Sequence, residues 1–226
     1  MTAGFYGKVH THGDFIQRGL PRHFLDPWDA WLQQSLAASR EQLGEQWLDR
    51  YLVAPVWRFA LSAGICGDPA WLGLLMPSVD RVGRYFPLTL ATPLDAGRSA
   101  SAAFLLAEEW FRQAGALLVT ALEDGFDLEH FQQRVNALPP PPTETRPALA
   151  GQAALRIAGC EHWNDVFARL APGLLEMAYA PASLWATQRM DAQECSLLLA
   201  RGLPAPGNFS LLLDFEGTDA RWQRMH

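Results

Sequence analysis

The chain has 226 residues, of which 49% are hydrophobic and 19% are charged, a composition that excludes a disordered chain and indicates one main folded core. Its formal net charge of −6 argues against a nucleic-acid-binding protein, because neutralising a phosphate backbone requires a clustered basic surface. No apolar run reaches the roughly 18 residues that span a bilayer, and three widely spaced cysteines do not form a disulfide framework or a zinc knuckle. We therefore expect a cytoplasmic protein with no signal peptide, no membrane insertion and no nucleic-acid partner.

A hairpin and a helix are predicted at the N-terminus. Residues 4–9 and 15–18 have strand-like composition and flank a polar turn, which predicts a hairpin. Asp26 is a suitable N-cap and Pro27 suits the first helical position, which predicts a helix from there to about residue 43.

A second helix and three strands are predicted next. A short helix is expected over residues 45–53, and the period-two alternation over residues 56–65 predicts a half-buried strand. Residues 71–76 and 86–91 have the composition of two more strands, which residues 77–85 connect.

Two helices follow these strands. Ser99 or Ser101 can cap a long helix whose apolar residues keep a 3.6 period to residue 121, and a further helix is expected over residues 127–138. The four prolines at 139–142 cannot continue that helix and favour a stiff, extended linker.

The C-terminal part has weaker patterns. A helix is expected over residues 162–170 and strands over residues 183–189 and 195–200, whereas residues 207–214 leave helix and strand open.

Together these elements predict an α+β fold, in which an antiparallel sheet of five or more strands carries helices on its faces. A hairpin, a helix, a three-stranded meander and a closing helix follow one another as in longin or profilin-like (SNARE-like) domains. We expect a core over residues 1–138, a proline-rich linker over 139–147, and a C-terminal extension over 148–226 that packs on the core.

His10, His12 and Asp14 form the most metal-like group in the sequence. Alternate residues of a strand point to one face, so two imidazoles and a carboxylate could converge. A zinc site needs three or four protein ligands with supporting hydrogen bonds. We therefore interpret these residues as the polar part of a hairpin turn, and we predict no cofactor and no bound metal.

The connection between the second and third strands of the meander is a candidate anion-binding loop. Ser78, Asp80, Arg81 and Arg84 surround a glycine, and paired guanidinium groups match phosphate or carboxylate geometry. The alternative is a structural turn in which Asp80 or Asp14 forms ion pairs with these arginines. The candidate interaction or anion site comprises Lys8, Asp14, Arg18, Ser78, Asp80, Arg81 and Arg84.

Three stretches resemble one known family: GFYGKVHTHGDFIQRGLP at residues 4–21, YLVAPVWRFAL at 51–61 and MPSVDRVGRYFPLTLA at 76–91. They are similar to the signature of the TagF family of type VI secretion-associated proteins. SLWAT at 183–187 and RGLPAPGNF at 201–209 resemble the tail of that family. The resemblance implies a post-translational regulator, generally a repressor, of type VI assembly, with type VI components and the forkhead-associated scaffold protein as expected partners.

The sequence contains no motif typical of an enzyme, such as a nucleophile elbow, a phosphate-binding loop or a zinc-protease motif. We therefore expect a protein that binds partners and does not catalyse a reaction. The alternative is a small phosphate- or anion-handling hydrolase that uses residues 10–14 and 78–84. A binding module should have an exposed apolar patch, whereas an enzyme should have a concave site of converging titratable groups.

Overall fold

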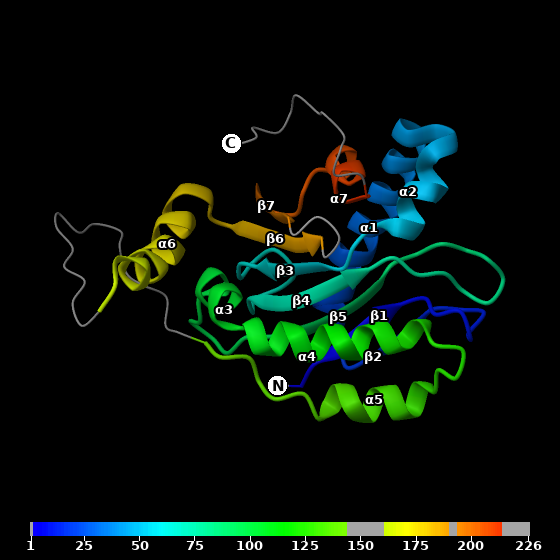
Figure 1. Ribbon diagram of the computed structural model, residues 1–226, viewed down its shortest axis with the longest axis horizontal. Helices are drawn as coiled ribbons and strands as arrows, with labels where there is room; N and C mark the ends of the chain where they lie inside the picture. The colour runs from blue at the N-terminus through cyan, green and yellow to red at the C-terminus, as the bar shows by residue number, and fades with distance from the viewer. Residues whose placement is uncertain (1, 144–160, 190–193, 214–226) are drawn as a thin grey trace.

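The structure is a computed structural model that describes residues 2–143, 161–189 and 194–213 (Figure 1). Its strands are β1 (Gly4–Gly7), β2 (Ile16–Arg18), β3 (Trp57–Leu61), β4 (Trp71–Met76), β5 (Leu88–Pro93), β6 (Ala182–Arg189) and β7 (Glu194–Arg201). Its α-helices are α1 (Arg22–Leu43), α2 (Trp47–Val53), α3 (Ala100–Leu106), α4 (Glu108–Val119), α5 (Leu128–Asn136), α6 (Trp163–Tyr179) and α7 (Ser210–Leu213). Short 3-10 helices are η1 (Gly44–Gln46), η2 (Thr120–Leu122) and η3 (Pro206–Asn208). None of the helices in these described ranges is long and apolar enough to cross a membrane.

The described strands form one sheet in the order β2-β1-β5-β4-β3-β6-β7, and every neighbouring pair is antiparallel. The α+β class and the antiparallel sheet flanked by helices agree with the prediction. The sheet exceeds five strands because β6 pairs with β3, where Phe59 lies opposite Trp185, and β7 then pairs with β6. The C-terminal strands therefore continue the sheet that the N-terminal strands begin.

Each face of the sheet carries its own apolar core. Helices α3, α4 and α5 cover one face, over residues such as Phe5 and Leu74. Helices α1, α2 and α7 lie on the other side of the sheet (Figure 1) and cover a core rich in tryptophan. In that core the indoles of Trp28 and Trp185 are nearly parallel, at an interplanar angle of 4° and a centroid distance of 6.0 Å. Trp57 lies in the same core.

Helix α1 begins one turn earlier than predicted. Its N-cap is Pro21, so Asp26 and Pro27 lie inside the helix. Phe24 in the added turn is fully buried, and its ring centroid lies 4.3 Å from that of Trp71. Burying an aromatic side chain contributes about 1.5–3 kcal/mol. That burial helps to offset the hydrogen bond that Pro27 cannot donate.

Two strand boundaries also differ from the predictions. The strand predicted over residues 56–65 ends at Leu61, because Gly64 and Gly67 adopt φ values of 90° and 85° and turn the chain. The strand predicted over residues 86–91 begins two residues later, since Phe86 donates its backbone N–H to the preceding loop.

The long helix predicted from Ser99 or Ser101 is two helices, α3 and α4, which meet at Ala107. Ser99 is the cap, and its hydroxyl accepts a hydrogen bond from the N–H of Ala102 at 3.1 Å. Ala107 has non-helical dihedral angles, yet its N–H donates to Ala103 and its carbonyl accepts from Phe111. The apolar period therefore runs across the interruption, which explains why the pattern predicted one helix.

Two described segments after the prolines form more helix than the pattern predicted. The helix expected over residues 162–170 continues to Tyr179 as α6, with Pro172 inside it. The segment at 207–214, for which helix and strand were both left open, is helical: it contains the last two residues of η3 and the whole of α7. Its last residue lies outside the described residues. Residues 144–147 of the predicted linker also lie outside them.

Candidate functional site

Lys8, Asp80 and Arg84 meet at the loop between β4 and β5. The Asp80 side chain is fully shielded from solvent. Its Oδ2 accepts hydrogen bonds from Lys8 Nζ at 2.9 Å and from Arg84 Nε at 2.6 Å. Its Oδ1 accepts from the backbone N–H groups of Val82 at 3.0 Å and Arg84 at 2.8 Å. The chain's own donors therefore occupy the acceptor positions of this carboxylate.

These donors decide the charge state of Asp80. Burial raises the pKa of Asp80, but the hydrogen bonds from the Arg84 and Val82 backbones and from the Lys8 and Arg84 side chains outweigh burial. They hold the pKa of Asp80 well below its usual range. Asp80 is therefore ionised near neutral pH and compensates the charge of Lys8, which is only 5% exposed.

The local sequence explains this turn. Asp80 bonds the N–H two residues further on, as Asp does in Asx-turns. Gly83 has a φ of 84°, in the left-handed region that favours glycine, and its N–H donates to the Asp80 carbonyl at 3.0 Å. A β-bridge between Val79 and Tyr85 closes the base of the turn.

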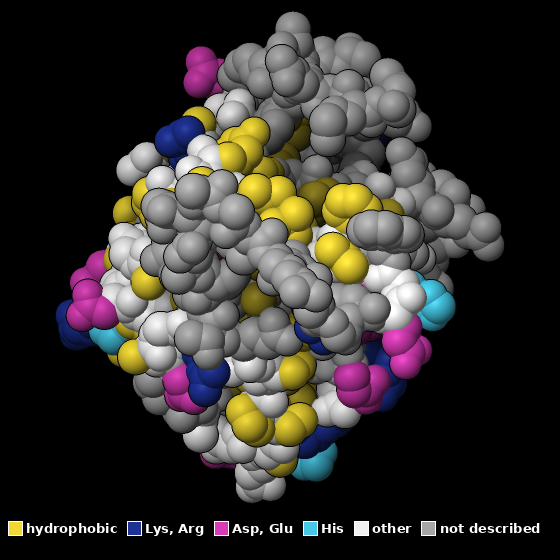
Figure 2. Space-filling model, turned by 90° about the vertical axis from the view of Figure 1, so that its left-hand side faces the viewer, with side chains coloured by type: hydrophobic (Ala, Val, Ile, Leu, Met, Phe, Trp, Pro, Cys, Tyr) yellow, Lys and Arg dark blue, Asp and Glu magenta, His cyan; other side chains and the backbone are white. Residues whose placement is uncertain are grey.

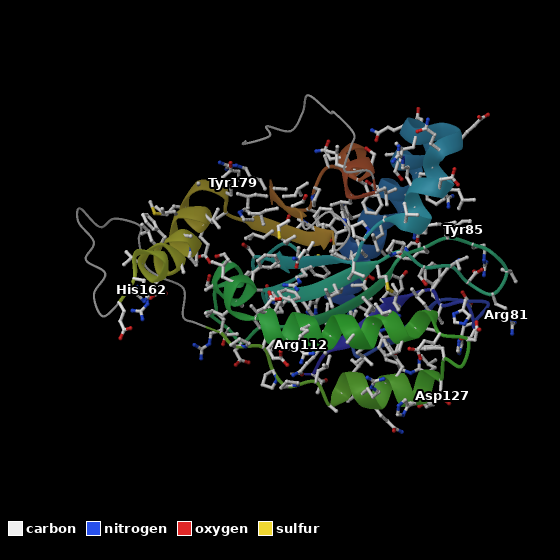
Figure 3. All side chains as sticks on the ribbon, viewed as in Figure 1. Arg81, Tyr85, Arg112, Asp127, His162 and Tyr179 are labelled. Atoms are coloured by element: carbon white, nitrogen blue, oxygen red, sulfur yellow. The ribbon has the colours of Figure 1, made fainter. Side chains whose placement is uncertain are left out.

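Hydrogen bonds join this turn to the connection between β1 and β2. The Arg81 N–H donates to the His12 carbonyl at 2.9 Å, and Arg84 Nη2 donates to the Gly13 carbonyl. Figure 3 shows Arg81 at this end of the molecule, on the loop that extends beyond the sheet. Its side chain is exposed and has no hydrogen-bonded or ionic partner within the described ranges. Arg81 is thus the one arginine of this turn whose guanidinium group is not engaged by the described residues.

Ser78 connects the loop to the interior through hydrogen bonds with Lys8 and Tyr51. Its Oγ donates to the Lys8 carbonyl at 2.7 Å. Its backbone carbonyl accepts from Tyr51 Oη at 2.8 Å, and its N–H donates back to the same oxygen at 3.0 Å. Burial raises the pKa of Tyr51. Sequence reasoning missed Tyr51, because a hydroxyl at the end of a predicted helix leaves no periodic signal.

Asp14 and Arg18 do not join this cluster. Asp14 is exposed, and its Oδ1 accepts from the N–H of Phe15 at 2.8 Å. Arg18 lies at the far end of β2, opposite Phe5, and donates to the carbonyl of Gln17. The predicted pairing of an arginine with a carboxylate is made by Arg84 and Asp80, and not by Asp14.

His10 and His12 lie on the connection between β1 and β2. His12 Nδ1 lies 2.9 Å from the hydroxyl of Thr11, and its ring meets the edge of Phe126 at a centroid distance of 6.4 Å. Within the described ranges, no three His, Cys, Asp or Glu side chains are grouped so that they could hold a metal ion.

Exposed apolar side chains follow one face of α6. Phe167, Leu174 and Met177 expose 62%, 50% and 59% of their surface, and their spacing of seven and three residues places them on the same side of the helix. Figure 2 looks at the end of the molecule that carries α6 and shows apolar side chains at the surface there. We call these three residues the α6 stripe. The sequence pattern missed most of it, because the helix was predicted to end before Pro172.

A groove lies between α2, α7 and the ends of the strands. Tyr51, Trp57, Pro87, Phe209 and Leu212 are among its lining residues. Its lining residues are apolar or aromatic, and the polar side-chain groups of Tyr51 and Trp57 are already bound to the backbone of Ser78 and Leu212. The groove therefore offers apolar surface and does not gather titratable groups.

Comparisons with known proteins give a family match and a similar solved structure. The family model described as TagF N-terminal domain, type VI secretion system-associated, matches residues 4–138. The crystal structure of PA0076 from Pseudomonas aeruginosa PAO1 is 38% identical in sequence, covers 100% of both chains and superposes with a TM-score of 0.84. No curated protein matches the chain.

Proposed function

The chain belongs to the TagF family of type VI secretion system-associated proteins, and from this membership we propose that it is a cytoplasmic regulator that represses type VI assembly after translation. It acts by binding protein partners, and the forkhead-associated scaffold protein of the system is the first partner to test. The five strands β2-β1-β5-β4-β3, with α1 after the hairpin and α3 and α4 after the meander, support a longin-like core.

The observation that favours binding is the α6 stripe. Phe167, Leu174 and Met177 present apolar side chains to solvent on one helix face. Exposed apolar side chains that gather on one helix face are typical of protein interaction sites. Glu176, on another face of the helix, accepts hydrogen bonds from Ser99, the N-cap of α3, and from Ser101 in α3, and these bonds fix the orientation of the stripe.

The alternative is a hydrolase that uses residues 10–14 and 78–84, and the geometry of these segments favours it less. A general base must reach the proton that it abstracts. Asp80 is buried, and both of its oxygens accept hydrogen bonds from the chain itself. Asp14 is exposed on the neighbouring connection and does not pair with Arg84 in the described structure. We therefore propose a structural role for this cluster.

The test is genetic complementation in a bacterium that carries the gene and an active type VI system. Deletion should raise secretion, and wild-type protein should lower it again in proportion to its abundance. Met177→Glu should restore repression poorly, because it places a charge on the α6 stripe. Ala168→Glu adds the same charge to an exposed position on another face of α6 and should repress normally.

Partner pull-down is measured in parallel with secretion. Met177→Glu should lose partner binding and repression together, while keeping the melting temperature of the wild type. Equal repression by Met177→Glu and Ala168→Glu would exclude the stripe as the docking surface. A variant that folds and binds its partner but no longer represses would contradict action by binding and indicate catalysis.

A further inference from the structure

The two edges of the sheet differ in length and in chemistry. Strand β2 at one edge has three residues, two of which are the polar Gln17 and Arg18. Strand β7 at the other edge has eight residues with the sequence ECSLLLAR. Short edges and charged edges resist pairing with other chains, whereas long apolar edges promote it. The β7 edge has neither form of protection.

The register identifies which β7 groups point away from the sheet. The Gly202 N–H donates to the Pro181 carbonyl at 2.7 Å, whereas the Ala182 carbonyl accepts from Ser62, next to β3. Hydrogen-bonded and non-bonded pairs alternate along an antiparallel ladder. The even-numbered residues of β7 therefore bond β6, and the odd-numbered residues direct their N–H and C=O groups outward.

The outward groups are those of Cys195, Leu197, Leu199 and Arg201. Within the described residues, no backbone hydrogen bond reaches them from outside the sheet. Between Arg201 and Leu213, the described part of the chain after β7, the backbone does not return along this edge, because Pro204 and η3 pack against α1 on the tryptophan-rich face. The edge therefore presents a row of backbone donors and acceptors that only another extended strand can satisfy in register.

The side chains of β7 suit a copy of the same strand. Leu197 is 66% exposed, and between Glu194 and Arg201 the strand carries no charge and no proline. In an antiparallel pair of identical strands, the end that carries Arg201 runs beside the opposite end of the other copy. No like charges then lie directly opposite one another.

Symmetry selects the alignment. A two-fold axis perpendicular to the sheet requires each odd-numbered residue of β7 to face an odd-numbered residue of the copy, and each even-numbered residue to face an even-numbered one. Centring the axis on Leu198 pairs Leu197 with Leu199 of the copy and Cys195 with Arg201, so every outward residue is used. Centring it on Leu197 would instead pair Arg201 with residue 193, beyond the start of β7.

We infer that two copies of this chain associate edge to edge through β7, in an antiparallel register centred on Leu198, and form one continuous sheet across the two-fold axis. The inference rests on the open edge and on its self-complementary sequence. It is independent of the proposed function.

The experiment measures molar mass by light scattering during gel filtration over a range of concentrations. Wild-type protein should have twice the chain's mass of 25.1 kDa. Leu197→Pro removes an outward N–H that β6 does not use, so the chain should stay folded and become monomeric. Leu197→Lys should also be monomeric. The matched control Leu174→Lys alters an exposed leucine of α6, away from the edge, and should remain a dimer.

A disulfide test checks the register. In a background with Cys160→Ser and Cys195→Ser, Leu198→Cys should give a cross-linked dimer on mild oxidation, because the two copies of residue 198 face each other. Ser196→Cys should not, because its opposite residue is Ala200. A monomeric wild-type protein, dimers that survive both Leu197 substitutions, or cross-linking at 196 and not at 198 would overturn the inference.

Discussion

Four hydrogen-bond donors converge on one buried carboxylate at Asp80, and two of them come from the charged side chains of Lys8 and Arg84. Asp80→Asn keeps the shape but leaves the Lys8 ammonium group beside a neutral amide that presents its own N–H groups to donors. We expect this variant to melt several degrees below wild type, measured by circular dichroism. Asp14→Asn, at an exposed position on the neighbouring connection, should melt as wild type does. Equal melting temperatures for both variants would contradict the structural role of Asp80.

Acidification should remove the same stabilisation. The folded-state pKa of Asp80 is held below its ordinary value of 3.8, so its stabilising effect is complete above that pH and is lost as pH falls toward the folded-state pKa. The stability difference between wild type and Asp80→Asn should be constant from about pH 5 to about pH 8 and shrink below about pH 4. Urea unfolding midpoints at each pH measure this difference. A difference that widens on acidification would show that another group carries the effect.

The contribution of the Tyr51 hydroxyl to stability can also be tested with a single substitution. It exchanges two hydrogen bonds with the backbone of Ser78. Tyr51→Phe should therefore lower the free energy of unfolding by about 1 kcal/mol, since the backbone groups of Ser78 lose their buried partner. Tyr85→Phe is the matched control, because the Tyr85 hydroxyl has no hydrogen-bond partner within the described residues. Its effect should stay within about 0.5 kcal/mol.

At the scale of elements, Gly73 sets how closely β4 packs. A Cβ at this position would lie 2.6 Å from the Leu90 carbonyl oxygen and 2.4 Å from the Phe59 ring, which itself packs on Trp28 and Trp185. Gly73→Ala should therefore destabilise the fold by roughly 1–3 kcal/mol in chemical unfolding.

The control is Gly115→Ala in α4, where the nearest neighbour of a new Cβ is a Leu74 methyl at 3.9 Å. Alanine suits a helix interior better than glycine by about 0.5–1 kcal/mol, so this variant should be more stable than wild type. Equal losses at both glycines would show that strand packing is not the cause.

The same elements show what sequence could predict. Where the signal is local, the prediction holds: the helix expected over residues 127–138 forms as α5, which Asp127 caps, and the three strands expected over residues 56–91 form an antiparallel meander. The strand predicted to be half-buried is instead buried on both faces, because helices cover both sides of the sheet. Where the cause lies far along the chain, the prediction fails. The start of α1 depends on the packing of Phe24 against Trp71. The pairing of β6 with β3 cannot be predicted from the sequence of either strand alone.

In the candidate site too, local features could be predicted from the sequence and long-range contacts could not. The polar residues of the β4–β5 loop stand out in the sequence, but two arginines and two carboxylates allow several pairings. The choice of Asp80 depends on Lys8, which lies 72 positions away in the chain. The sequence pattern did not predict the α6 stripe, because a proline such as Pro172 usually marks the end of a helix. The packing of α6 against α3 is what shows that the helix continues.

At the scale of the whole molecule, the segment matched by the family model does not complete its own core. The indole N–H of Trp31 donates to the Pro204 carbonyl at 2.7 Å, and that of Trp57 donates to the Leu212 carbonyl at 2.8 Å. Both acceptors lie after residue 138, where the family match ends. A chain cut after residue 143 should therefore bind the hydrophobic dye ANS and lose near-ultraviolet circular dichroism.

Co-expression provides the control for this truncation. Residues 1–143 and 161–226, produced together as separate chains, should restore the near-ultraviolet signal and abolish dye binding, because the second chain supplies the missing strands and acceptors. A fragment of residues 1–143 that folds like the intact protein would contradict this view of the core.

The parallel pair of Trp28 and Trp185 has an optical consequence. Two indoles at 6.0 Å couple their electronic transitions, and the two partners come from opposite ends of the sequence. Their coupled ultraviolet band therefore exists only while the C-terminal strands lie against α1. The Trp28–Trp185 contact should therefore report, without a label, whether the two halves of the protein are joined, and Trp185→Phe should identify its part of the signal among the nine tryptophans.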